Sequence, residues 1–127
     1  MIRRPRIIRS AIGVAALVAL AGAAWIAQTG GAAPPLVALR ATEFLYDPKQ
    51  AMAHAGEIVF VVKNEGAIEH NFVLQDASRQ KIAEIAVIEP RTSAEVRATL
   101  APGTYAIICT LPGHRDAGMV ASLVVAP

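Results

Sequence analysis

Residues 104–125 read TYAIICTLPGHRDAGMVASLVV, which is two strand patterns joined by one short loop. Successive side chains of a strand point to opposite faces, so Tyr105, Ile107 and Cys109 would share a face. The two apolar partners of the cysteine predict that this face points into the protein. The second pattern begins at Met119 and continues almost to the C-terminus. The loop between them contains a Pro-Gly pair, which predicts a tight and fixed turn.

The chain upstream of this stretch has the same strand character, with turn residues at regular intervals. We expect about seven short strands in all, over residues 36–44, 57–62, 70–75, 82–88, 94–100, 104–109 and 119–125. Residues 46–49 predict a turn or a strand break, and residues 51–56 predict a turn before a strand. No amphipathic helical pattern of any length follows the N-terminal segment. The sequence therefore predicts an all-β, Greek-key sandwich in one domain.

The N-terminal segment has the pattern of a targeting sequence. Four arginines precede an uncharged apolar run over residues 11–27, AIGVAALVALAGAAWIA. Residues 1–27 are therefore either a secretory signal peptide or an uncleaved membrane anchor, and the sequence leaves both open. Residues 28–35 (QTGGAAPP) form an uncharged Gly/Pro-rich linker, so the folded domain would cover residues 36–127. We expect a periplasmic or other extracytoplasmic protein, either soluble after cleavage or tethered to the membrane.

The charge balance excludes one class of partner. The chain has 12 basic and 10 acidic residues, but four of the basic residues are the arginines of the leader. The mature domain thus has eight basic residues against ten acidic ones, a net charge near −2. No Lys/Arg cluster or basic stripe follows the leader, so nucleic-acid binding is not expected.

Three side chains of the opening stretch are good metal ligands, Cys109, His114 and Met119, with the spacing C-x4-H-x4-M. A fourth candidate, His70, starts the strand predicted at 70–75. A sandwich could bring the start of that strand beside the end of the strand that carries Cys109. Two imidazoles and a thiolate, with a long and weak bond to methionine, form a blue-copper electron-transfer site. The sequence therefore predicts one mononuclear copper ion held by these four side chains.

Each donor taken alone has an ordinary structural explanation. Cysteine is often a small buried residue, methionine usually fills a core, and a loop histidine is commonly a surface group. The combination favours metal binding, because Cys109 is the only cysteine of an exported chain and cannot form an internal disulfide. Coordination would hold that thiolate and shield it from oxidation. The remaining histidine, His54, lies in a predicted turn and is interpreted as a surface residue.

These motifs resemble the cupredoxin family, the small blue copper proteins that include plastocyanin, azurin, auracyanin and rusticyanin. The matching stretches are 64–66 with 70–72, and 103–105 through Cys109 to 112–114 and 118–119. The resemblance extends more weakly over about residues 43–125. The gap before the methionine is more similar to auracyanin and rusticyanin than to azurin, and the gap after the cysteine is longer than in plastocyanin.

The resemblance implies a role for each matching residue. His70, Cys109 and His114 would be the equatorial ligands, and Met119 would be the axial one. Asn71 would bond the ligand loop and tie the two halves of the site together. An apolar patch around the exposed edge of the loop histidine would be the electron port and docking surface, formed by Leu111, Pro112, Gly113, Ala117 and Gly118.

Three charged residues border this site. Arg115 and Asp116 would lie on the rim of the apolar patch. Glu69 stands before the first histidine, where azurins have a glycine whose carbonyl approaches the metal, and this difference argues against a close fifth ligand.

The implied function is one-electron transfer between redox partner proteins that dock near His114, without enzymatic conversion of a substrate. We expect the protein to act as a monomer. One alternative is a copper-trafficking protein, although the chain lacks the Met-rich and His-rich tracts of that class. Another is a fragment of a copper oxidase or nitrite reductase, but only His54 is spare for a second copper centre.

Overall fold

The structure is a computed structural model that describes residues 31–127, so the leader predicted for residues 1–27 lies outside the described residues. All regular secondary structure in the described part is β-strand, which confirms the all-β prediction. Nowhere in residues 31–127 does a helix have the length and hydrophobicity that a membrane crossing requires.

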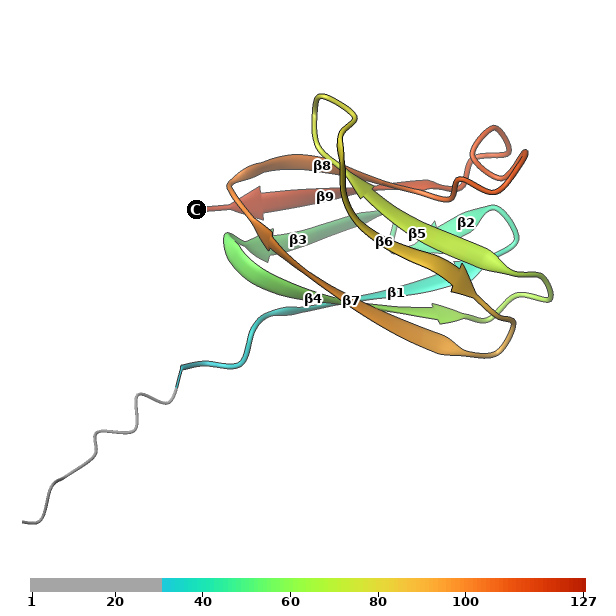
Figure 1. The fold of residues 1–127 in the computed structure, drawn as a ribbon, viewed down its shortest axis with the longest axis horizontal. Helices are drawn as coiled ribbons and strands as arrows, with labels where there is room; N and C mark the ends of the chain where they lie inside the picture. Colours follow the sequence, from blue (N-terminus) through green and yellow to red (C-terminus); the bar gives the residue numbers. More distant parts are fainter. Residues whose placement is uncertain (1–30) are drawn as a thin grey trace, which may run out of the picture. The chain divides into compact units, whose positions relative to one another are not determined.

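The described part of the chain contains nine β-strands, which form two sheets that pack face to face (Figure 1). The four-stranded sheet has the order β2-β1-β4-β7, with β1 (Leu36–Thr42), β2 (Leu45–Asp47), β4 (Gly56–Asn64) and β7 (Ser93–Leu100). The five-stranded sheet has the order β3-β9-β8-β5-β6, with β3 (Gln50–His54), β5 (His70–Gln75), β6 (Lys81–Ile88), β8 (Gly103–Ile108) and β9 (Val120–Ala126). The chain crosses repeatedly from one sheet to the other, as a Greek-key sandwich requires.

Burial alternates along the strands, which shows that one face of each sheet points into a core between the sheets. Buried residues alternate with exposed ones through most of β1 and with partly buried ones through most of β9, as expected for strands with one face turned to the core. Phe60 of β4 and Phe72 of β5 are fully buried, and their ring centroids lie 5.3 Å apart across the two sheets. Cys109 and Met119 belong to the same buried cluster. The predicted metal ligands therefore rest directly on the core.

Two strands, β2 and β3, were not predicted from the sequence. The turn expected at 46–49 is partly wrong, because Tyr46 is fully buried inside β2, and the turn expected at 51–56 is wrong, because Gln50–His54 forms β3. Both strands lie at sheet edges: β2 pairs with β1, the strand directly before it, and β3 pairs in parallel with the distant strand β9. The β3 sequence, QAMAH, has no β-branched residue. Tertiary pairing therefore makes a strand where local propensity gives no signal.

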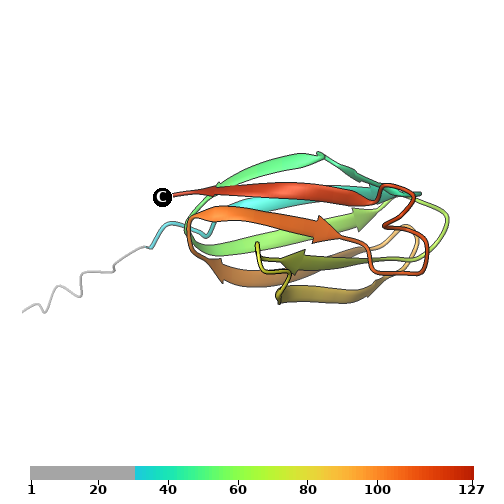
Figure 2. The same cartoon turned by 90° about the horizontal axis from the view of Figure 1, so that it is seen from above.

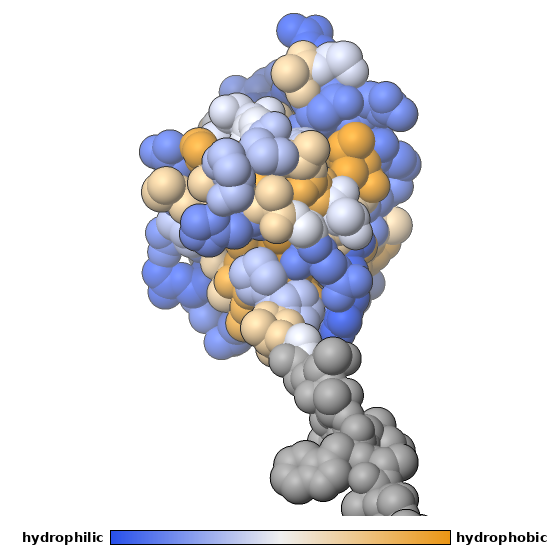
Figure 3. Space-filling view, turned by 90° about the vertical axis from the view of Figure 1, so that its left-hand side faces the viewer, coloured by the Kyte–Doolittle hydropathy of each residue, from blue (hydrophilic) through white to orange (hydrophobic). Residues whose placement is uncertain are grey.

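The segments that carry the predicted ligands meet at one end of the sandwich. The start of β5 and the loop between β8 and β9 both lie at the end away from the C-terminus (Figure 1). Figure 2 shows the same loop extending beyond the strands when the molecule is seen from above. Figure 3 faces the opposite end, where hydrophilic residues surround smaller apolar areas. β8 ends at Ile108, so Cys109 stands just beyond the last paired residue.

Candidate metal centre

The approach to His70 is fixed by Asn64, the last residue of β4. Its side chain is fully buried, and its Nδ2 donates hydrogen bonds to the carbonyl oxygens of Ile68 and Ile88, both at 2.8 Å. Its Oδ1 accepts a hydrogen bond from the Gly66 amide at 2.9 Å. These three bonds fold the β4–β5 connection into a short loop that delivers His70 to the start of β5.

The loop between β8 and β9, residues 109–119, carries Cys109, His114 and Met119 and is called the ligand loop below. Main-chain hydrogen bonds connect its two ends and its interior. The Cys109 amide donates to the Met119 carbonyl at 3.2 Å, so the two sulfur-bearing residues are neighbours at the base of the loop. The Met119 amide donates to the His114 carbonyl at 3.0 Å, and the His114 amide donates to the Leu111 carbonyl at 3.1 Å. Gly113 has a φ of +79°, a left-handed conformation that glycine adopts without strain. The predicted tight turn is confirmed.

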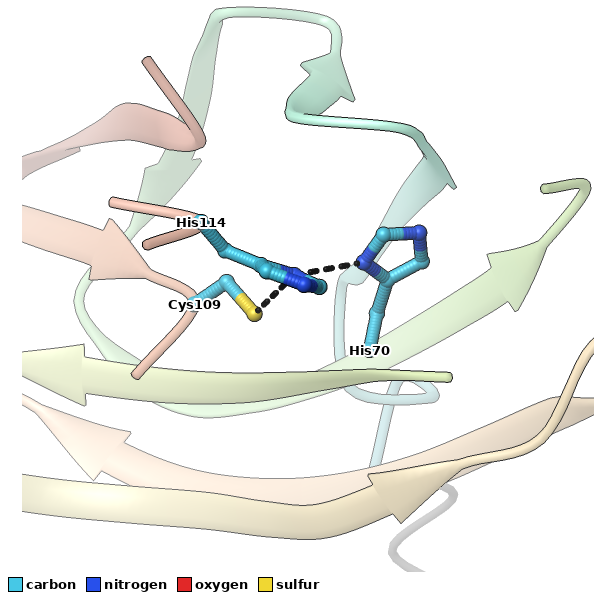
Figure 4. Close-up of side chains that lie close together, drawn as sticks. All are labelled: His70, Cys109 and His114. Atoms are coloured by element: carbon cyan, nitrogen blue, oxygen red, sulfur yellow. Dashed lines mark hydrogen bonds between the residues drawn. The ribbon is translucent and has the colours of Figure 1, made fainter. Parts of the chain in front are cut away.

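The side chains of His70, Cys109 and His114 point toward one another (Figure 4). His70 Nδ1 lies 3.3 Å from His114 Nδ1, and Cys109 Sγ lies 3.4 Å from that same His114 nitrogen. All three donor atoms lie within 4.8 Å of one another. Donors bonded to one ion at roughly 2.0–2.3 Å stand roughly 3.3–3.7 Å apart. The observed spacing therefore suits a single metal ion.

Burial separates the four predicted ligands into two groups. His70, Cys109 and Met119 are each 0% exposed, whereas His114 is partly exposed. His70 Nδ1 and Cys109 Sγ both lie close to His114 Nδ1, so three atoms with lone pairs face one another. Lone pairs that converge in this way are satisfied by a cation. Thiolate and thioether favour Cu(I) and imidazole serves both oxidation states, so the donor set fits copper.

The surroundings of His70 favour its neutral form. Burial and the nearby charge of His114 lower the pKa of His70, and the carboxylate of Glu43 opposes this effect. A neutral imidazole is the form that binds a metal ion. The environment thus prepares this histidine for coordination.

Asn71 joins the two ligand-bearing segments. Its Nδ2 donates a hydrogen bond to Thr110 Oγ1 at 2.7 Å, and its Oδ1 accepts one from the Thr110 amide at 2.8 Å. The hydroxyl of Tyr46 in turn donates to the Asn71 carbonyl oxygen. Burial raises the pKa of Tyr46, so the phenol stays neutral and keeps its proton for this bond. Residues next to His70 and next to Cys109 are thereby held at a fixed separation.

The turn between β1 and β2 supports the first histidine, a role that the sequence did not reveal. Glu43 Oε1 accepts hydrogen bonds from the amides of Ala67 at 2.5 Å and Ile68 at 3.3 Å. The bond from Ala67 is the largest of the effects that lower the pKa of Glu43. A Cβ on Gly66 would lie 2.5 Å from that same carboxylate oxygen, so glycine leaves room for this contact.

The same turn also supports the second histidine. Phe44 packs edge-on against the His114 ring, with centroids 5.1 Å apart and an interplanar angle of 83°. Its backbone has a φ of 62°, which is uncommon for an aromatic residue and is stabilised only by surrounding contacts. The sequence places Phe44 at the end of an expected strand and carries no sign of this contact. The β1–β2 turn thus bonds the loop that precedes His70 and contacts the ring of His114.

The comparison with known protein families decides the identity of this fold and site. A family model described as a cupredoxin-like domain matches residues 13–124, most of the chain. The chain belongs to the cupredoxin-like family. Among solved structures, an auracyanin from the photosynthetic bacterium Roseiflexus castenholzii is 26% identical over 76% of this chain and 100% of that chain, with a TM-score of 0.67.

Two further solved structures agree with this cupredoxin assignment. Auracyanin A, a "blue" copper protein from Chloroflexus aurantiacus, is 26% identical over 74% of this chain and 100% of that chain, with a TM-score of 0.66. An azurin from Methylomonas sp. strain J is 15% identical over 75% of this chain and 100% of that chain, with a TM-score of 0.65, and supports the fold alone. A search among curated proteins returned no match. The resemblance to blue copper proteins and the expected copper cofactor are confirmed.

The surface next to His114 in this cupredoxin is partly hollow. A depression of about 510 Å³ is lined by His114, Leu111 and Pro112 together with Ile68 from the β4–β5 loop. Glu69 and Glu89 lie at its border. The apolar surroundings expected for the loop histidine thus include Ile68 and Phe44, which the sequence did not single out.

Residues outside the donor cluster also have clear positions. His54 is exposed and is not a member of the donor cluster, and its ring nitrogen lies 3.0 Å from the Pro127 carbonyl oxygen. Gly113, Ala117 and Gly118 are exposed on the ligand loop. The structure brings the predicted residues His70, Cys109 and His114 together, whereas the contacts of Glu43, Phe44, Tyr46 and Asn64 had no signal in the sequence.

Proposed function

We propose that this protein is a one-electron carrier that binds one copper ion through His70, Cys109, His114 and Met119. The observation that carries the proposal is the convergence of two imidazole nitrogens and one thiol at 3.3 and 3.4 Å on top of a buried core. Bound copper supplies the chemistry of this site, a one-electron change between Cu(II) and Cu(I).

The protein contributes rigidity and the exclusion of water. His70, Cys109 and Met119 are completely buried, so solvent does not compete for these donors. The bonds of Asn64, Asn71 and the ligand loop hold the donors in one arrangement. A site that keeps its shape needs little reorganisation when its charge changes, which favours fast electron transfer.

His114 is the donor at which we place electron exchange with partners. It is the one partly exposed member of the four, and apolar groups of Leu111 and Pro112 lie beside it. We propose that redox partner proteins dock on this surface, that the protein acts as a monomer, and that it has no enzymatic activity of its own. The basic and apolar pattern of residues 1–27 supports an extracytoplasmic location, with cleavage or anchoring left to experiment.

Addition of Cu(II) to the purified protein tests the proposal. We expect an intense visible thiolate-to-copper absorption band, a narrow copper hyperfine splitting in the electron paramagnetic resonance (EPR) spectrum, and reversible one-electron reduction. Cys109→Ser should abolish the band, whereas His54→Ala should leave it unchanged and serves as the matched control. A colourless protein that retains only Cu(I) would contradict the carrier role and support copper trafficking instead.

A further inference from the structure

The basic residues of the described domain divide into paired and unpaired groups. Within residues 31–127, four of the eight Lys/Arg side chains form ion pairs, namely Arg40, Lys63, Lys81 and Arg97. The other four have no ion pair in this part of the chain, namely Lys49, Arg79, Arg91 and Arg115. Three of these four, all except Arg91, line a single groove. This concentration is notable because the domain itself carries a net charge near −2.

The groove lies on the outer face of the five-stranded sheet and has a volume of about 600 Å³. Ala106 and Ile108 contribute to its floor, and they alternate with core residues along β8. Lys49 comes from the β2–β3 connection, Arg79 from the β5–β6 loop, and Arg115 from the ligand loop. Figure 1 shows the β5–β6 loop rising beside β8. Three separate segments thus bring positive charge to one apolar-floored groove.

Among residues 31–127, Asp76 is the one carboxylate that lines the groove, and its Oδ1 already accepts hydrogen bonds from its own turn. Asp76 Oδ1 accepts hydrogen bonds from the Ser78 amide at 2.8 Å, the Ser78 hydroxyl at 2.7 Å and the Gln80 amide at 2.9 Å. Asp76 therefore stabilises its own turn and forms no ion pair with the three cations around it. The groove keeps an excess of positive charge that a bound anionic group would neutralise.

The position of Arg115 connects this groove with the proposed electron port. Arg115 directly follows His114, so the groove and the proposed electron port are lined by consecutive residues of the same loop. The depression that His114 lines includes the carboxylates Glu69 and Glu89 and no Lys or Arg of the described residues. The groove and the depression thus differ in the sign of the charges that line them, and this difference would orient an approaching partner.

We propose that the groove of Lys49, Arg79 and Arg115 is the docking site for an acidic segment of the redox partner protein. This inference rests on the proposed electron-carrier function. A protein segment fits better than an anionic membrane surface, because the cations surround a concave groove with an apolar floor. Unpaired charges around such a site speed association and make it sensitive to salt.

The test uses a short poly-glutamate peptide as the probe and the copper-loaded, reduced protein labelled with ¹⁵N. We expect saturable amide shifts at lining residues such as Gln75, Thr104 and Ser122. A poly-lysine peptide of the same length should not produce them. The double substitution Lys49→Glu with Arg79→Glu should weaken poly-glutamate binding about tenfold or more, because like charges then face each other.

The matched control is Arg91→Glu, which reverses the one cation of residues 31–127 that has no ion pair and lies outside the groove. It should change the affinity less than about twofold, since distant exposed charges are largely screened. Equal weakening by the control, or shifts centred away from the groove, would overturn the proposal. Groove-dependent binding to phosphatidylglycerol vesicles without binding to the peptide would also overturn it, in favour of a membrane surface.

The visible copper band separates failure of this inference from failure of the proposed function. Neither Lys49 nor Arg79 is a predicted ligand, so both the double variant and the control should keep the band. A coloured protein that does not bind the peptide would overturn the docking site alone. A protein without the band would contradict the electron-carrier role itself.

Discussion

The two histidines of the site lie in contrasting environments. His70 is completely buried, starts a paired strand, and follows a loop fixed by the side chains of Asn64 and Glu43. His114 is partly exposed, lies in a loop between strands, and contacts the side chain of Phe44. The first environment is built from buried hydrogen bonds and the second from a short turn and surface contacts.

Under the proposed function, this difference assigns metal binding mainly to the His70 side and electron exchange to the His114 side. Changes around His70 should mainly affect the stability of the fold, because they leave buried polar groups without partners. Changes around His114 should affect the fold less, because the loop is exposed and its bonds are local. The substitutions below compare the two sides, beginning with the largest expected effect.

Asn64→Ala should have the largest effect on stability. The substitution removes the hydrogen-bond partner of the Gly66 amide and of the Ile68 and Ile88 carbonyls. We therefore expect the free energy of unfolding to fall by about 2–4 kcal/mol. Urea denaturation of the copper-free protein measures this. Arg115→Ala, an exposed change on the His114 side, should cost less than about 0.5 kcal/mol. Equal losses of unfolding free energy in the two variants would contradict the difference between the His70 side and the His114 side.

Tyr46→Phe should have an intermediate effect. The hydroxyl that it removes donates to the buried Asn71 carbonyl, so we expect a loss of about 1–2 kcal/mol. Tyr105→Phe is the matched control, because the Tyr105 hydroxyl donates to the Ala101 carbonyl at 2.8 Å in an exposed setting. The control should lose less unfolding free energy, because water can replace the exposed hydrogen bond of the Tyr105 hydroxyl. A larger loss for Tyr105→Phe in thermal unfolding would contradict the importance of the buried bond.

Gly113→Ala tests the ligand loop itself. Nothing lies within 4 Å of the added Cβ, so the expected loss of about 1 kcal/mol comes from the left-handed φ of +79° alone. Gly113→Asn should lose less, because asparagine tolerates this conformation better. Urea midpoints of the three proteins give the order. Identical losses for alanine and asparagine would show that the backbone conformation is not the cause.

Phe44→Ala should have the smallest effect on stability and a visible effect on the site. The ring is 40% exposed and its backbone is strained, so the change in unfolding free energy should stay within about 1 kcal/mol. Loss of the edge contact should leave the His114 ring less fixed, which would broaden the Cu(II) EPR lines. Leu45→Ala, at a neighbouring residue of similar exposure (37%), is the control and should leave them sharp. Unchanged lines in Phe44→Ala would argue against a bracing role.

The donor set could be predicted because most of it is local. Cys109, His114 and Met119 lie within one short stretch, and strand alternation places the cysteine on the inner face. His70 required the further step of joining two strand ends, which the sandwich fold supplies. Asn71 came from the family resemblance, and the structure shows the two hydrogen bonds that this expectation requires.

The remaining features depend on contacts between segments far apart in the sequence. Glu43 and Phe44 act on loops that follow them by more than twenty residues, and no spacing rule connects them. The edge strand β3 exists because β9 pairs with it. The three cations of the groove come from three separate loops. They are far apart in the sequence, so their concentration in one groove becomes visible only in the fold.

X-ray absorption at the copper edge of the loaded protein tests the central claim most directly. The account predicts one copper per chain with one short copper–sulfur bond and two imidazole nitrogens, and loss of the sulfur contribution in Cys109→Ser. A copper shell made only of nitrogen and oxygen, or a spectrum that Cys109→Ser leaves unchanged, would contradict it.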